Sequence, residues 1–358
     1  MLPLPIDRAV NHAVKHKETK TNQSAVNSRP DHSTDTLNQP LVAIINPQSF
    51  RMSLRDRAEQ SIRIVETAGG KVYRASQLSE IEGALAQAFA GSTAALPARL
   101  VIAGGDGTLQ ACVSWLGQHL DAEQWPDVIL LGAGRTNYVA HDIGTGRNFL
   151  KTLDAMLTQP PGALQTVRRH TLQLEHPDLG QQIGFFVAGG LVDDVIREIH
   201  QWRAEKPGWH RTNRAATAIG LVREGLRWLS GKTRYTARPM TIRAEPLGEL
   251  NGPCRLIIMT TLILSGKWIN PYNSVGIGPL RINAIRQDAP AFKRRFLRLL
   301  VGRFTPLMNL ENGYLSGYCS TISISNIKNI MIDGQAFDLK PSSPLRIVAG
   351  PTVRFLLP

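Results

Sequence analysis

The sequence has little of what marks several large classes of protein. Its 358 residues include only three cysteines, Cys112, Cys254 and Cys319, with no CxxC pair among them, so neither a disulfide framework nor a zinc site is predicted. No apolar run reaches the roughly 18 residues that a membrane-spanning helix needs. The first ten residues contain two prolines and an aspartate and do not resemble a signal peptide. These absences predict a protein of the reducing cytoplasm.

Negative charge is also scarce. The chain has 28 acidic residues against 41 lysines and arginines, which gives a net charge of +13. The surplus is concentrated in the second half, at 197–243 and 293–303, and it predicts an anionic partner. Because the basic runs lack interleaved stacking aromatics on a recognisable module, we expect an acidic membrane surface and no nucleic acid.

The pattern along the chain predicts a leader and two domains. Residues 1–38 are polar, with few large apolar groups, and we expect them to be disordered. Residues 39–165 alternate short apolar runs with helical spacing, which predicts a parallel sheet covered on both faces, with ligands at the carboxyl ends of its strands. Residues 166–358 read mostly as strands joined by turns and predict a β-rich antiparallel domain with helical insertions. The expected strands of the first domain lie in LVAIINPQ, which breaks into a loop at Asn46 and Pro47, and in KVYRAS, RLVIAGG and DVILLGAG.

One loop carries the clearest chemical signal. Residues 100–108 read LVIAGGDGT, an apolar run that ends in three glycines, an aspartate and a threonine. Gly104, Gly105 and Gly107 allow close backbone approach to a ligand, and the following helix directs free N–H groups at phosphates. Asp106 suggests phosphoryl transfer, since a carboxylate beside phosphates needs a bridging cation or must handle the acceptor's proton. The alternative is a structural turn in which Asp106 caps a helix.

Two further turns are candidates for the same site. In LLGAGRTN, Gly134 ends a strand and Thr136 and Asn137 offer polar groups, although a polar turn that caps the next helix explains them equally well. In NIMIDGQAF, Asp333 precedes a glycine, which is typical of a hairpin turn. A two-domain enzyme would need a second acid or base from the second domain, and Asp333 is the candidate.

The segment AFKRRFLRLLVGRF, residues 291–304, combines an apolar stripe with basic residues. It fits a helix lying in the headgroup layer of an anionic bilayer, or a helix packed on the core with a solvated basic face.

Together these motifs resemble the diacylglycerol kinase catalytic family, which includes bacterial diacylglycerol kinase-like proteins and sphingosine kinase-like lipid kinases. The resemblance rests on NPQS, GGDGT, GAGRTN, FFVAGGLVDDV and the late DG turn, and it covers about residues 41–358. It implies a phosphofructokinase-like α/β lobe facing a β-sandwich lobe. It also implies ATP and Mg²⁺ as cofactors, a lipid hydroxyl as acceptor, and reversible association with the membrane.

The family pattern assigns roles to individual residues. Catalysis would use Asp106, Asp333 and the position of Gln335, and Asp106 would organise phosphate-bound Mg²⁺. The nucleotide would be bound by Asn46, Ser76, Gly104, Gly105, Asp106, Gly107, Thr108, Leu109, Gln110, Gly134, Arg135, Thr136 and Asn137.

Three family positions differ in this chain. Gln335 replaces the glutamate of the usual DGE motif, and an amide cannot accept a proton at neutral pH. The GTxND turn appears as GRTNY, and the acidic DG-x-LD segment appears as residues 277–281 without its carboxylates. The leading hypothesis is therefore an ATP-dependent kinase of a diacylglycerol- or sphingoid-type lipid. The alternatives are a catalytically impaired nucleotide- or lipid-binding relative and a soluble-substrate kinase resembling NAD kinase. A monomer and a homodimer both remain open.

Overall fold

The computed structural model describes residues 40–90, 96–145, 148–159, 163–190, 238–263, 270–300 and 302–358. They belong to one compact unit that runs from Thr36 to Pro358. The predicted leader and the basic segment around 197–237 lie outside the described residues. The division into two domains at residue 165 stays a prediction.

The first part of the chain forms the predicted parallel sheet. Its strands lie in the order β4-β3-β1-β2, and all three pairings are parallel. The strands are β1 (Leu41–Ile45), β2 (Lys71–Arg74), β3 (Arg99–Gly104) and β4 (Asp127–Gly132). The helices are α1 (Arg57–Thr67), α2 (Leu78–Ala88), α3 (Asp106–His119), α4 (Tyr138–Ile143) and α5 (Phe149–Thr158), with a 3-10 turn at Ala122–Gln124.

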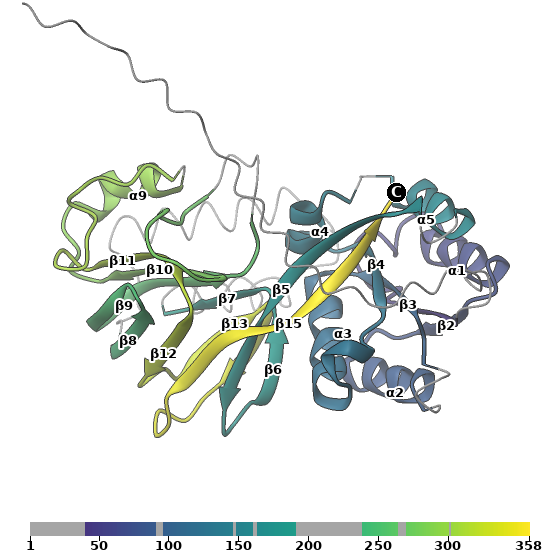
Figure 1. Cartoon of the computed structure of the whole chain (residues 1–358), viewed down its shortest axis with the longest axis horizontal. Coiled ribbons are helices and arrows are strands. Elements are labelled where there is room, and N and C mark those ends of the chain that lie inside the picture. The colour runs from purple at the N-terminus through teal and green to yellow at the C-terminus, as the bar shows by residue number, and fades with distance from the viewer. Residues whose placement is uncertain are drawn as a thin grey trace, which may run out of the picture. The chain divides into compact units, whose positions relative to one another are not determined.

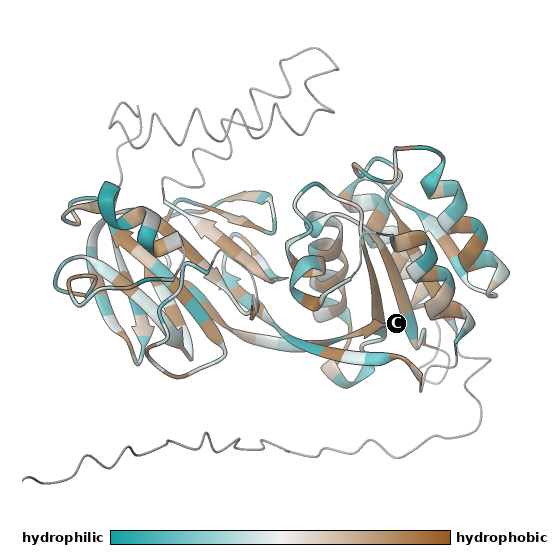
Figure 2. Ribbon diagram, turned by 90° about the horizontal axis from the view of Figure 1, so that it is seen from above, coloured by the Kyte–Doolittle hydropathy of each residue, from teal (hydrophilic) through white to brown (hydrophobic). Residues whose placement is uncertain are grey.

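Alternate residues of these strands face two separate cores. Ile44 and Ile102 pack with residues of α2 and α3, whereas Ile45 and Val101 pack with residues of α1 and α5. Figure 1 shows α1 and α5 on one side of the sheet and α2 and α3 on the other. Strands β1, β3 and β4 are buried on both faces, as a parallel sheet covered by helices requires, whereas the edge strand β2 is partly exposed. Figure 2 shows brown strands between the helices.

The second part is built from antiparallel strands, as predicted. Residues of several of its strands share a further core, separate from the two described above, that includes Leu174, Ile242, Ile257 and Ile282. Its strands are β5 (Gln165–His176), β6 (Gly180–Gly184), β7 (Phe186–Gly189), β8 (Pro239–Glu245), β9 (Gly248–Thr260), β10 (Leu280–Arg286), β11 (Tyr314–Cys319), β12 (Thr321–Ser325), β13 (Asn329–Ile332), β14 (Gln335–Asp338) and β15 (Leu345–Leu357). The predicted fold class, a parallel α/β part followed by an antiparallel β part, is confirmed.

The long strand β15 joins the two kinds of sheet. It pairs antiparallel with β5 and β12, and near its end Phe355 pairs with Val128 of β4 in parallel. In Figure 1 it is the yellow arrow that runs from the antiparallel strands to the edge of β4. All the named strands therefore belong to one continuous sheet.

Helix α9 (Phe292–Leu300) forms within the predicted amphipathic segment. Phe292 and Leu299 are buried against a small core that includes Ile285, whereas Lys293 and Arg294 are exposed. The buried part of the apolar stripe thus packs inside the protein, which matches the core alternative for these two residues. No helix of the described ranges has both the length and the apolar character needed to cross a membrane.

Candidate functional site

The glycine loop lies where three parallel strands end. The Asn46 N–H donates to the Ala103 oxygen at 2.9 Å, and the Ala133 N–H donates to the Gly104 oxygen at 2.7 Å, so the segments after β1, β3 and β4 are joined edge to edge. A Cβ atom on Gly134 would lie only 2.6 Å from the Cα atom of Gly105. The two loops therefore approach each other more closely than any residue larger than glycine permits at these positions.

A pocket of about 490 Å³ opens beside this junction. Its walls come from the segment after β1, the start of α2, the two glycine turns and β14. Seven of the predicted residues line it, together with the predicted catalytic position on β14: Asn46, Ser76, Gly105, Gly107, Thr108, Gly134, Arg135 and Gln335. The volume is within the range of small-molecule sites in proteins.

A side-chain hydrogen bond ties the first loop to the glycine loop. The Asn46 amide nitrogen donates to the Thr108 hydroxyl at 3.1 Å, while the Asn46 amide oxygen accepts the Gln48 N–H at 3.0 Å. A Cβ atom on Gly104 would lie 2.5 Å from the Thr108 side chain, so glycine at 104 makes room for the threonine. Residues that are distant in sequence thus form one wall of the pocket.

Arg135 is the one charged side chain among the residues that line the pocket in the described part of the chain. Its guanidinium carbon lies 5.5 Å from the centre of the Phe50 ring, in a cation–π arrangement. A cation at the rim of a pocket lined otherwise by neutral groups favours an anionic ligand.

Asp106 is not among the residues that line the pocket. Its carboxylate accepts the N–H groups of Tyr138 at 3.0 Å and Val139 at 3.3 Å, at the start of α4. Burial raises the pKa of this carboxyl group, and the two backbone hydrogen bonds offset part of that rise. The carboxylate thus caps α4, which lies after the neighbouring strand, in addition to any chemical role.

Asp333 occupies the predicted hairpin turn between β13 and β14. Its buried carboxylate accepts the N–H groups of Phe185 at 2.9 Å and Phe186 at 2.8 Å. Burial and, to a smaller extent, the negative charge of Asp106 raise its pKa well above the usual range. Two carboxylates that are close enough to repel each other therefore lie at the junction of the α/β and β parts.

Gln335 brings the late turn into contact with the glycine loop. Its amide nitrogen donates to the Gly107 oxygen at 3.3 Å. The side chain therefore reaches the pocket, but its amide supplies no base.

The remaining predicted residues do not line the pocket. Leu109 and Gln110 are buried on α3, and the Gln110 amide donates to Ser114 and Gln182. Thr136 is exposed, while the buried Asn137 donates to the Gly134 oxygen at 2.9 Å and so shapes the turn. The nucleotide roles of these residues stay predictions.

Sequence reasoning missed part of the lining: Gln48, Ser49, Phe50, Ser53, Leu78 and Ile81. The first three directly follow Asn46 and Pro47 and Ser53 lies three residues further on, so extending the predicted loop along the chain would have found them. Leu78 and Ile81 gave no such signal, because apolar residues at the start of a helix are typical of core packing.

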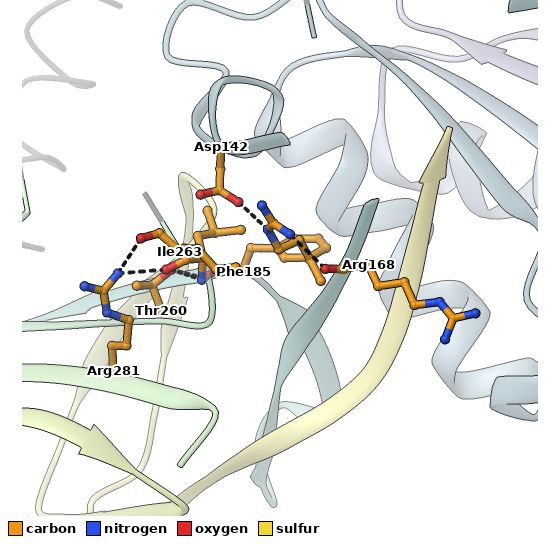
Figure 3. A network of polar contacts seen from close by, with 8 residues as sticks. Asp142, Arg168, Phe185, Thr260, Ile263 and Arg281 are labelled. Atoms are coloured by element: carbon orange, nitrogen blue, oxygen red, sulfur yellow. Dashed lines mark hydrogen bonds and ion pairs between the residues drawn. The ribbon is translucent and has the colours of Figure 1, made fainter. Parts of the chain in front are cut away.

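A second polar network lies next to Asp333. The Thr260 hydroxyl donates to the Phe185 oxygen at 2.7 Å, and the Leu262 N–H donates to the Thr260 hydroxyl at 3.1 Å. The Arg281 guanidinium then donates to the oxygens of Leu262 and Ile263, each at 3.0 Å (Figure 3). In the same region Asp142 of α4 accepts a hydrogen bond from Arg169 at 2.5 Å.

The described residues do not fit a protein-held metal ion. They contain no group of three or more His, Cys, Asp or Glu side chains placed to bind one. Both Asp106 oxygens accept backbone N–H groups. Residues 277–281 take the place of the family's acidic DG-x-LD segment, and the last of them is the cation Arg281. Any magnesium at this site would therefore be held mainly by the phosphates of a nucleotide.

Comparison with known proteins agrees with this geometry. Residues 40–168 match the model of the diacylglycerol kinase catalytic domain. Three solved structures from Bacillus anthracis str. Sterne are similar; one is described as a diacylglycerol kinase and two provisionally so. In the same order, their sequence identities to this chain are 11%, 14% and 12%, and their TM-scores are 0.57, 0.62 and 0.60. The matches cover 89%, 92% and 89% of this chain, and 97%, 98% and 97% of the matched chains. No curated protein matches the sequence.

Proposed function

Residues 40–168 belong to the diacylglycerol kinase catalytic domain family, and from this premise we propose that the chain is an ATP-dependent lipid kinase. It would transfer the γ-phosphoryl group to a hydroxyl group of a diacylglycerol- or sphingoid-type lipid. The observation that carries the proposal is the pocket where glycine turns after β3 and β4 meet Asn46, Thr108 and Arg135. Glycines that allow close approach of the backbone, and one cation, are what a polyphosphate needs.

In the proposed reaction, the acceptor hydroxyl oxygen forms a bond to the γ-phosphorus of ATP. The bond from that phosphorus to the β–γ bridging oxygen breaks, ADP leaves, and the hydroxyl proton passes to the Asp106 carboxylate. Burial raises the pKa of Asp106, which makes its carboxylate a better proton acceptor near neutral pH. Asp333 holds the backbone at Phe185 within the β part, and Gln335, two residues further on, contacts the glycine loop at the Gly107 oxygen.

The acceptor would be reached at the surface of an anionic membrane. The net charge of +13 favours reversible attachment, and exposed Lys293 and Arg294 on α9 add to the local positive field. Magnesium enters as the counter-ion of the ATP substrate. We propose a cytoplasmic, peripherally bound enzyme that has no nucleic-acid partner.

A second candidate function follows from Gln335. This side chain contacts the Gly107 oxygen at the place where the family resemblance expects a glutamate base. If Asp106 does not act as the base in its place, the protein binds nucleotide and lipid but transfers no phosphate. This binding role is the second candidate function.

The test is transfer of labelled phosphate from ATP to diacylglycerol and sphingosine in mixed micelles. Asp106→Asn should lower turnover by about 100-fold or more, the usual weight of one general base. Asp154→Asn, an exposed aspartate on α5, is the matched control and should keep wild-type activity. Undiminished turnover in Asp106→Asn would rule out the mechanism, and ATP binding without any product would favour the second candidate.

A further inference from the structure

The β part contains a buried cation, Arg281, that has no carboxylate partner among the described residues. Arg281 is only 5% exposed, and within the described residues no Asp or Glu side chain lies within ion-pair distance of it. Its terminal nitrogens donate to the oxygens of Leu262 and Ile263 and to the Asn270 side chain at 2.8 Å. These acceptors are neutral, so they solvate the charge without cancelling it.

Several polar atoms around Arg281 have no partner among the described residues. These are the Arg281 Nε, Tyr272 hydroxyl, Thr261 hydroxyl and Asn283 amide oxygen, all of them buried. A buried donor without an acceptor destabilises a protein, and native structures contain few such groups. Four such atoms in neighbouring segments call for polar partners.

The four residues, which we call the Arg281 cluster, are neighbours in the fold. The Arg281 guanidinium carbon lies 4.8 Å from the centre of the Tyr272 ring, and Asn283 donates to the oxygen of Pro271 next to Tyr272. Thr261 directly precedes Leu262, to which Arg281 donates. Three of the four unpartnered atoms belong to donor groups and one residue is cationic, so the missing ligand should be an anion.

The Arg281 cluster adjoins the proposed reaction centre. A chain of hydrogen bonds joins the two: the Phe185 N–H donates to Asp333, and the Thr260 hydroxyl donates to the Phe185 oxygen. The Leu262 N–H then donates to the Thr260 hydroxyl, and the Leu262 oxygen accepts from Arg281. The cluster is also close to the molecular surface, because Ile263, which accepts from Arg281, is 55% exposed.

We propose that the Arg281 cluster binds the anionic headgroup of the acceptor, so that the substrate is a hydroxyl-bearing lipid whose headgroup carries a phosphate or carboxylate. This inference rests on the proposed function, since it specifies the acceptor of that reaction. It differs from the neutral diacylglycerol- or sphingoid-type acceptor that the sequence suggests. The Arg281 guanidinium supplies the counter-charge, and the Tyr272 and Thr261 hydroxyl groups donate hydrogen bonds.

Binding of short-chain lipids below their aggregation limit tests this directly, by calorimetry and without turnover. Wild-type protein should bind dihexanoyl phosphatidylglycerol about tenfold or more tightly than neutral dihexanoylglycerol, which is the weight of one charge-assisted hydrogen bond. Arg281→Gln should remove that preference and leave binding of the neutral lipid and of ATP unchanged. Arg281→Lys should restore part of it. Glycerol 3-phosphate as a third probe separates recognition of a lipid headgroup from capture of a free phosphate ester.

Controls keep the result decisive. Arg243→Gln, an exposed arginine in the same part of the fold, should retain the preference. Tyr272→Phe removes only a hydroxyl group and should weaken anionic-lipid binding even if the Arg281 variants fail to fold. Equal binding of the two lipids by wild-type protein would overturn the inference while leaving lipid kinase activity intact. Anionic-lipid preference without phosphate transfer would leave the inference standing and refute the kinase.

Discussion

A methyl group at Gly134 should damage the nucleotide pocket by pushing two loops apart. Its Cβ atom would lie 2.6 Å from the Cα atom of Gly105 and 3.1 Å from the Asn137 amide oxygen. Carbon atoms in contact prefer about 3.5–4.0 Å, so the methyl group would be about 1 Å too close. Because the atom it meets is backbone, no side-chain rotation relieves the clash.

The expected cost is that of an overpacked site, about 1–3 kcal/mol. Gly105 and Gly134 both line the pocket, so separating their loops also displaces the N–H groups that would hold phosphates. If this free energy is lost entirely from the binding of ATP, the affinity for ATP drops by about 5-fold to about 150-fold. Any part borne by the free protein appears as a lower free energy of unfolding.

Calorimetric titration with ATP and urea unfolding together measure both parts. Gly83→Ala is the matched control, because a Cβ atom there meets nothing within 4 Å and Gly83 lies inside α2. This control should leave ATP binding unchanged and stabilise the fold by about 0.5–1 kcal/mol. If Gly134→Ala binds ATP as wild type does and unfolds at the same urea concentration, the close approach of the two loops is not a feature of the protein.

Three further results are expected. Ser114→Ala should lower the free energy of unfolding by about 1–3 kcal/mol, because the buried Ser114 hydroxyl both donates to and accepts from the backbone of Ile183; an unchanged urea midpoint would contradict this. Gln335→Glu should raise turnover in the phosphate-transfer assay if a base is missing, and no gain would leave Asp106 as the base. The pKa values of Asp106 and Asp333 are raised, so the folded state binds protons at these carboxyl groups more readily than the unfolded state does. The stability that comes from this proton binding is complete below pH 3.8 and is lost as pH rises through the folded pKa values. The pH dependence of urea unfolding should therefore differ between wild type and Asp333→Asn, and parallel curves would refute the shift.

Local chemistry was enough to predict much of the fold. Apolar runs that end in glycine or asparagine located β1, β3 and β4, since a buried parallel strand must be apolar on both faces. The hairpin at Asp333 followed from the turn preference of an aspartate–glycine pair. Strand β11 was missed, because YLSGYC is short and carries a glycine and a serine that look like loop residues.

The predicted site was less complete, for a physical reason. Sequence indicates which residues end a strand, but not which way a side chain turns once there. The carboxylates of Asp106 and Asp333 accept backbone N–H groups 32 and 148 residues away in the chain, at Tyr138 and Phe185. Tertiary pairing decides such partners, so a carboxylate in a catalytic-looking motif proved also to hold the backbone in place.

The course of β15 has a consequence for biosynthesis. Its residues lie far beyond β4 in the chain, yet Phe355 pairs with Val128, and the strand also pairs with β5 along most of its length. While the polypeptide is being made, the β4 edge of the nucleotide-binding sheet therefore has no β15 beside it until residues 345–357 emerge from the ribosome. The nascent first half would carry an unpaired, apolar strand edge, which is a template for aggregation. Completion of the α/β part is thus coupled to synthesis of the β part, and the sheet that carries the glycine turns is finished only when the last strand of the chain has been made.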